Sequence, residues 1–168
     1  RAVPGVAGRR RWGMTLAVLA AAVAMRAPLV AAPPFLSDDL YRYVWEGRVL
    51  EAGRSPYALR PEAPELAPLR DPVLYPRVTR KHLVTIYPPA AQFFFLASRK
   101  ILGEGTGRIR IALVAAEVAS WLLVAALLAR LGRSPEGVLL LAWHPLAAVE
   151  IASSGHIDGL LLPALAAA

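Results

Sequence analysis

The sequence contains no cysteine, and this absence removes two classes of site at once. Disulfide frameworks and thiolate metal sites both need cysteine, so the chain relies on neither. A Gly-rich dinucleotide fingerprint, a P-loop and a nucleophile elbow are also missing. The sequence therefore gives no support to a nucleotide-sugar donor taken from solution.

Acidic residues are scarce compared with basic ones, 12 against 19, which gives the 168-residue chain a net charge of +7. Hydrophobic residues make up 57% of it, above the roughly 45–50% of soluble domains. The excess of Ala, Leu and Val lies in blocks, and the basic residues flank these blocks. This pattern indicates membrane spans with headgroup contacts rather than a nucleic-acid partner.

The apolar blocks predict an all-α fold, a polytopic bundle of membrane helices forming part of one domain. Because the chain begins at Arg1 and ends at Ala168 within an apolar run, we interpret it as the N-terminal part of a longer polytopic protein. Eight of the 15 prolines fall between residues 53 and 89, which excludes long helices there and predicts an irregular loop. The expected segments are a span at 12–31, an outer loop at 32–87 with an interfacial helix at 38–52, short spans at 88–102 and 137–151, a span at 109–131 and the start of another at 160–168.

The basic cluster at 9–11 precedes the first span, so the positive-inside rule places the N-terminus in the cytoplasm and the 32–87 loop outside. Two topologies remain open beyond this point. If every apolar block crosses, His156 lies inside. If the arginines that follow the 109–131 span lie inside, the 88–102 block does not cross fully, and His156 faces the same side as Asp38.

The most informative stretch is the acidic pair Asp38-Asp39, just beyond the first span. Ser37 is an expected N-cap, with both acids in the first turn of an amphipathic helix that lies in the interface plane. The pair could simply favour the start of that helix. A carboxylate there could instead take a proton from a sugar hydroxyl, or hold a divalent cation together with a lipid phosphate. We select Asp38 and Asp39 as candidate catalytic residues.

Other polar and aromatic residues are candidate substrate ligands, and each group has a structural alternative. The aromatic residues could be ordinary interfacial side chains, the basic residues could bind headgroups, and the Glu150–Asp158 group could be a polar network between helices. The spacing of that last group provides too few ligands for a metal site. The candidates are Arg42, Tyr43, Trp45, Glu46, Arg80, Lys81, His82, Tyr87, Glu150, His156 and Asp158.

Two charges fall inside expected spans. Arg26 either extends to the headgroups or faces the site and binds an anion. Glu117, with Glu150, His156 and Asp158, would line a polar path if the chain were part of a transporter, which is the main alternative to an enzyme. A non-catalytic membrane scaffold is a third interpretation.

The motifs together resemble a known family. Phe35-Leu36-Ser37-Asp38-Asp39-Leu40-Tyr41-Arg42-Tyr43-Val44-Trp45-Glu46-Gly47, Tyr87-Pro88-Pro89, Trp143-His144-Pro145 and Gly155-His156-Ile157-Asp158 are similar to motifs of GT-C membrane glycosyltransferases. The chain looks most like bacterial polyprenyl-phosphate-mannose-dependent mannosyltransferases. In the second motif such enzymes often have Asn-Pro and Gly-His-Asn-Asp, so this chain departs from them at two positions.

The resemblance implies a function. A hexosyl group, mannose by this likeness, would pass from a polyprenyl-phosphate carrier to a glycan or glycolipid acceptor, with inversion and with Asp38 or Asp39 as the base. The partners implied are the lipid-linked donor, the acceptor and membrane lipids, with no nucleic acid and no firmly expected cofactor. The site would face outward from the plasma membrane of a bacterium.

Overall fold

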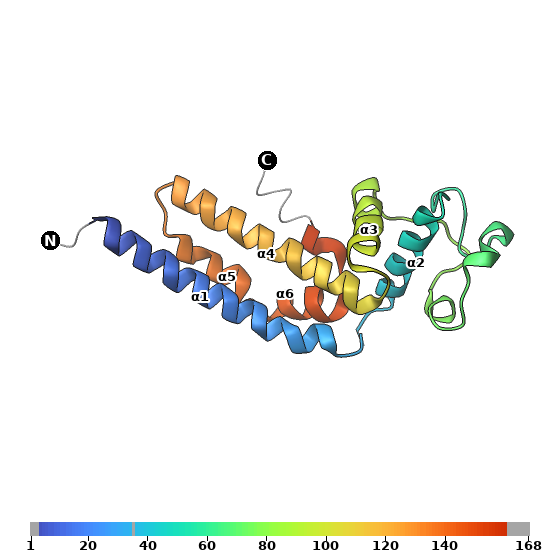
Figure 1. Ribbon diagram of the computed structural model, residues 1–168, viewed down its shortest axis with the longest axis horizontal. Coiled ribbons are helices and arrows are strands. Elements are labelled where there is room, and N and C mark those ends of the chain that lie inside the picture. Colours follow the sequence, from blue (N-terminus) through green and yellow to red (C-terminus); the bar gives the residue numbers. More distant parts are fainter. Residues whose placement is uncertain (1–3, 35, 161–168) are drawn as a thin grey trace.

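In the computed structural model, residues 4–34 and 36–160 are described, and all regular structure within them is helical. Two long helices, α1 (Pro4–Ala31) and α4 (Thr106–Arg130), lie side by side in opposite directions (Figure 1). The predicted all-α class is confirmed. Most of the span expected to start at 160 lies outside the described residues.

Two helices are long and apolar enough to cross a membrane, Trp12–Ala31 and Thr106–Arg130, close to the predicted 12–31 and 109–131. A third crossing is available as a bent pair, Pro135–Ala142 and Pro145–Ser154, whose halves meet at 57°. The bend falls where Pro145 follows His144, because a proline within a helix has no N–H to donate. This pair comprises η3 (Pro135–Val138), α5 (Leu139–Ala142), α6 (Pro145–Ala147) and the π-helical η4 (Ala148–Ser154).

The interior of the bundle contains an Arg–Glu pair. Nε and Nη2 of Arg26 each lie 2.7 Å from a Glu117 carboxylate oxygen, and both side chains are only 1% exposed. The guanidinium also lies 4.5 Å from the Trp121 ring centre. Its Nη1 donates to the Ala142 carbonyl at the end of α5. From the sequence we expected Arg26 to extend to the headgroups or to bind an anion. In the structure its guanidinium instead pairs with Glu117 on α4.

The remaining part of the molecule, between α1 and α4 in the sequence, is a cap at one end of the bundle (Figure 1). It consists of α2 (Asp39–Glu51), α3 (Pro89–Leu102) and the intervening loop with η1 (Pro64–Leu69) and η2 (Tyr75–Arg77). A 14-residue helix such as α3 is about 21 Å long, whereas a bilayer core is about 30 Å thick. The helix covers the range predicted as a short span, 88–102, and it packs against α2 and α4.

One arginine joins the end of the bundle next to the cap. Nη1 and Nη2 of Arg110, on α4, donate to the carbonyls of Leu29 and Ala32 at the end of α1 at 3.1 and 2.9 Å. Nη1 also donates to the Ser153 carbonyl of η4 at 3.4 Å. The end of η4 and the end of α1, which leads into α2, therefore lie at the same end of the bundle. The choice between the two topologies stays a prediction.

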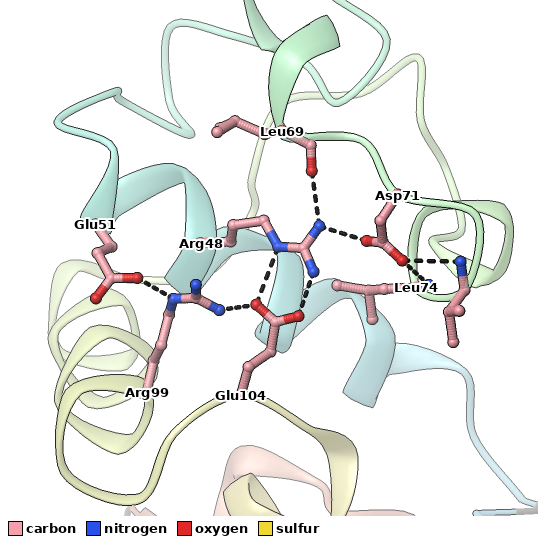
Figure 2. Close-up of polar contacts among 8 residues, drawn as sticks. Arg48, Glu51, Leu69, Asp71, Leu74, Arg99 and Glu104 are labelled. Atoms are coloured by element: carbon pink, nitrogen blue, oxygen red, sulfur yellow. Dashed lines mark hydrogen bonds and ion pairs between the residues drawn. The ribbon is translucent and has the colours of Figure 1, made fainter.

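Polar contacts fasten the cap together (Figure 2). Arg48 on α2 donates to the Leu69 carbonyl at 2.7 Å and pairs with Asp71 in the loop and Glu104 before α4. Arg99 on α3 pairs with the same Glu104. Burial alone would raise the pKa of Asp71, but the N–H groups of Leu74 and Val73 and the Arg48 guanidinium lower it overall.

Candidate functional site

The acidic pair stands at the start of α2. The helix begins at Asp39 with Asp38 as its N-cap residue, so Ser37 lies one position earlier than expected. Ser37 still contributes, because its Oγ accepts the Asp39 N–H at 3.2 Å. Asp38 is exposed and Asp39 is half-buried. Both carboxylates are therefore near the positive end of the helix dipole.

The two acids line two adjoining cavities. Asp39 lines one of about 260 Å³, here called the Asp39 cavity. Asp38 lines the other, of about 660 Å³, here called the Asp38 cavity. Thr79 and Arg80 line both. The remaining lining residues are Arg42, Leu83, Val84, Ile86 and Tyr87 in the Asp39 cavity, and Tyr41, Pro76, Arg77, Val78 and Lys81 in the Asp38 cavity.

The Asp38 cavity is basic. It contains Arg77, Arg80 and Lys81 against one carboxylate. Nη1 of Arg77 donates to the Tyr41 hydroxyl at 3.0 Å, and Lys81 Nζ donates to the Pro76 carbonyl at 3.1 Å. This net positive charge suits an anionic group such as phosphate. His82, grouped with these residues in the sequence, is exposed and lines neither cavity.

Arg42 and Glu46 form a buried network beside the Asp39 cavity, which Arg42 also lines. Both lie on the helix face expected to bind substrate. Arg42 Nε donates to Glu46 at 2.6 Å, and its terminal nitrogens donate to the carbonyls of Thr79, Arg80 and Leu83 at 3.4, 3.0 and 2.9 Å. The other Glu46 oxygen accepts from Thr85 at 2.8 Å and from Gln92 at 2.5 Å. Glu46 is fully buried, at 0% exposed. This network connects α2 to the loop and to α3.

The three candidate aromatic residues have different surroundings. Trp45 is buried against Val78 and near Tyr75, inside the cap. Tyr43 stacks on Phe95 at 4.6 Å, and burial, then Tyr87 and Asp39, raises the pKa of its phenol. Tyr87 contacts Tyr43 edge-on and lines the Asp39 cavity, where burial and the Asp39 charge raise its pKa to about 12. Of the three, Tyr87 is the one that lines either cavity.

A separate cavity of about 360 Å³, here called the Glu150 cavity, lies beside η4. Its polar lining consists of His144, Glu150, His156 and Asp158, and no arginine or lysine lines it. Nδ1 of His156 lies 2.5 Å from Glu150 Oε2. The structure thus brings together the three sequence candidates Glu150, His156 and Asp158, and adds His144 from the Trp143-His144-Pro145 motif.

The second motif packs against the acidic helix. Gly155 has φ +72°, and a Cβ at this position would lie 2.4 Å from Leu40 Cδ2. Ile157 in η5 (Ile157–Leu160) packs with the apolar cluster that contains Leu40 and Tyr43. The absence of a side chain at Gly155 therefore allows the Glu150 cavity to lie close to the start of α2.

The residues around the acidic pair do not form a cation site held by the protein alone. Asp38 and Asp39 line different cavities. Across residues 4–34 and 36–160, no three His, Cys, Asp or Glu side chains are arranged to hold a metal ion. The polar path expected for a transporter is also incomplete, because Glu117 pairs with Arg26 and does not line the Glu150 cavity with the other three residues.

Sequence reasoning passed over several residues of these sites. Thr79, which lines both cavities, carries no charge and lies in a proline-rich loop without periodicity, so no pattern marks it. Thr85 and Gln92 become visible only as partners of Glu46 in the folded chain. His144 stood in the Trp143-His144-Pro145 motif and interrupts an apolar block, but it was not selected as a ligand.

Comparison with known proteins identifies the family of the chain. No curated protein and no solved structure matches the chain significantly. The family model described as "Alpha-(1->6)-mannopyranosyltransferase, N-terminal domain" matches residues 4–168. This match covers nearly the whole chain, motifs and apolar helices included. The protein is therefore a member of the alpha-(1->6)-mannopyranosyltransferase family, and the chain corresponds to the N-terminal domain of such a membrane mannosyltransferase.

Proposed function

We propose that this domain carries the donor site of an enzyme that moves mannose from a polyprenyl-phosphate carrier to a glycan or glycolipid acceptor outside the cytoplasm. The observation that supports this most is the pair of adjoining cavities at the start of α2. A carboxylate stands in each, and the strongly basic Asp38 cavity adjoins the more apolar Asp39 cavity. Such a site offers separate places for a leaving phosphate and for a sugar.

Asp39 is the base in this proposal. It is half-buried and lines the smaller cavity with Tyr87, whereas Asp38 is exposed among cations. The acceptor hydroxyl oxygen attacks the anomeric carbon of mannose while the bond from that carbon to the phosphate oxygen breaks. The hydroxyl proton passes to Asp39, and the polyprenyl phosphate leaves as an anion. A single displacement from the opposite face inverts the anomeric centre, as in a GT-C enzyme.

The basic residues stabilise the leaving group. Arg77, Arg80 and Lys81 surround the Asp38 cavity, and positive charge aimed at a departing phosphate lowers the barrier to its departure. The phosphate needs no general acid, because it leaves well as an anion. A carrier lipid reaches this place from the bilayer, since the cap lies at the end of the spanning helices (Figure 1).

The Glu150 cavity is the proposed acceptor site. Its carboxylates and imidazoles accept hydrogen bonds from sugar hydroxyls, and its lack of arginine and lysine disfavours phosphate. Leu146 and Ile151 add apolar surface for the face of a sugar ring. The packing of Gly155 against Leu40 places this cavity at the same end of the bundle as Asp39.

The test of the base uses the full-length protein in membrane vesicles with radiolabelled polyprenyl-phosphate mannose. Asp39→Asn should lower kcat by about 10²- to 10⁴-fold, the usual contribution of a general base. Asp38→Asn should mainly alter the donor KM, and Glu65→Gln, at an exposed acid of the same loop, should change neither. Mannosyl transfer that survives Asp38→Ala and Asp39→Ala, alone and together, would remove the base from the proposal.

Two further measurements test the site's surroundings. Glu150→Gln and His156→Gln should raise the acceptor KM and leave the donor KM unchanged; the reverse pattern would reject the acceptor site. A cysteine introduced at Ser37, in a full-length protein without other reactive thiols, should react with a membrane-impermeant reagent added outside the cells. Protection from that reagent, with labelling only after lysis, would place the site in the cytoplasm and reject its outward orientation.

A further inference from the structure

Arg80 has an unusual backbone. Its φ is +49°, and it is the one non-glycine residue with positive φ among residues 4–34 and 36–160. An L-residue in this left-handed region costs about 1 kcal/mol or more relative to its ordinary conformation. Arg80 also belongs to the lining of both cavities at the acidic pair. A strained residue at such a position requires contacts that hold it there.

Arg42 supplies those contacts from the buried side. Its Nη1 donates to the carbonyl of Arg80 at 3.0 Å, and its Nη2 donates to that of Leu83 at 2.9 Å. The Leu83 N–H in turn donates to the Arg80 carbonyl at 3.0 Å, which closes the turn. The same guanidinium therefore contacts the two ends of the turn that begins at Arg80.

Arg42 is itself fixed. Its Nε donates to Glu46, whose other oxygen accepts from Thr85 and Gln92. Arg42 is 6% exposed. Because its donors already point to Glu46 and to three loop carbonyls, little of the guanidinium remains for a substrate, although its side chain borders the Asp39 cavity.

We propose that Arg42 is a positioning residue that holds Arg80 in its left-handed conformation, so that the Arg80 guanidinium is set between the two cavities for the donor phosphate. This inference rests on the proposed function, and it replaces the expectation that Arg42 and Glu46 bind substrate directly. Glu46 acts one step further away, by orienting Arg42.

The kinetic test uses full-length protein in vesicles with labelled donor. Arg42→Gln should raise the donor KM about tenfold, the order expected when a buried hydrogen-bonded charge is lost, with little change in acceptor KM. In an Arg80→Ala background the same change should have little further effect on the donor KM, because the group being positioned is gone. Arg54→Gln, an exposed arginine at the start of the same loop, is the control and should leave the donor KM unchanged.

Backbone exchange supplies a readout that does not depend on turnover. The Leu83 amide should exchange with solvent faster in Arg42→Gln than in the wild type, while amides in the middle of α4 keep their rates. If the Leu83 amide is unchanged, or if Arg42→Gln multiplies the donor KM equally with and without Arg80, the positioning role is wrong. If Arg80→Ala alone leaves the donor KM unchanged, Arg80 does not bind the donor phosphate, and the positioning role of Arg42 is rejected as well.

A milder variant covers the case in which Arg42→Gln does not fold. Glu46→Gln keeps the side-chain volume but removes the charge that orients Arg42, so it should raise the donor KM less than tenfold and speed Leu83 exchange slightly. Normal donor KM together with normal Leu83 exchange in Glu46→Gln would also overturn the inference.

Discussion

The bundle and the cap each bury one Arg–Glu pair, and the two pairs connect different kinds of structure. Arg26 and Glu117 join two long helices that are also held by apolar packing around Trp121. Arg42 and Glu46 lie on one helix and reach outward to a loop with little regular structure. Outside its own helix the bundle pair satisfies one main-chain oxygen, that of Ala142, so apolar side chains can replace most of its contribution. The cap pair is harder to replace, because Arg42 donates to three loop carbonyls, those of Thr79, Arg80 and Leu83, and all three would lose that donor.

The largest expected effect is in the bundle. Arg26→Ala or Glu117→Ala leaves one charge buried alone, which should cost about 3–5 kcal/mol of stability. The double change Arg26→Met with Glu117→Leu should recover most of this loss, measured by thermal unfolding of the full-length protein in detergent. A double variant that is no more stable than the single ones would show that the pair is indispensable and would end the contrast with the cap.

The same experiment in the cap should give the opposite result. Arg42→Met with Glu46→Leu removes the guanidinium donor from the Thr79 and Leu83 carbonyls and leaves the Arg80 carbonyl and the Gln92 amide with one partner each, at about 1–3 kcal/mol for each group left unpaired. We expect the double variant to remain at least about 3 kcal/mol less stable than wild type, with rapid proteolysis between residues 53 and 88. Recovery comparable to that in the bundle would refute the difference between the two pairs.

The contact between bundle and cap comes next in size. Gly155→Ala adds a methyl group 2.4 Å from Leu40 Cδ2 and strains a backbone at φ +72°, so it should cost about 1–3 kcal/mol. Gly53→Ala is the matched control, because Gly53 has φ +70° but nothing within 4 Å of the added carbon. Equal losses in thermal stability for the two variants would show that the backbone, and not Leu40, sets the cost.

The smallest effect belongs to the partly exposed pair of Arg48 and Asp71. Asp71→Asn should cost about 0.2–1 kcal/mol, as exposed ion pairs do. Because the folded pKa of Asp71 lies below its ordinary value, its contribution is present above about pH 4 and fades as the pH falls through the folded pKa. Stability curves of wild type and Asp71→Asn should therefore converge in acid. Curves that stay parallel down to pH 2 would contradict this assignment.

Sequence patterns predicted the elements better than their partners. Apolar runs predicted spans at 12–31 and 109–131, and the two helices long and apolar enough to cross a membrane lie close to these ranges. The stop of α1 at Ala31 follows from Pro33 and Pro34. The fold class and the family were also accessible, because the acidic motif and the second motif lie in continuous stretches. The roles proposed for Asp38 and Asp39 stay predictions.

Pairings between distant residues were out of reach. Glu117 lies 91 positions from Arg26, and nothing in either helix marks the other as its partner. The Arg42 network is similar, since it depends on backbone carbonyls, which every residue possesses and no sequence pattern displays. Three-dimensional packing, and not local propensity, decides which of them face an arginine.

The bend between Pro135–Ala142 and Pro145–Ser154 gives the Arg26–Glu117 pair a second role. Within an apolar bundle a proline break leaves main-chain oxygen without its helical N–H partner, and no water is at hand to solvate it. Nη1 of Arg26 reaches the Ala142 oxygen and takes the place of that water, and Glu117 then neutralises the charge so introduced. The buried ion pair in this apolar bundle is thus linked to the bend in the helix. If the helix were straight, the Ala142 oxygen would accept a helical N–H and would no longer need Arg26.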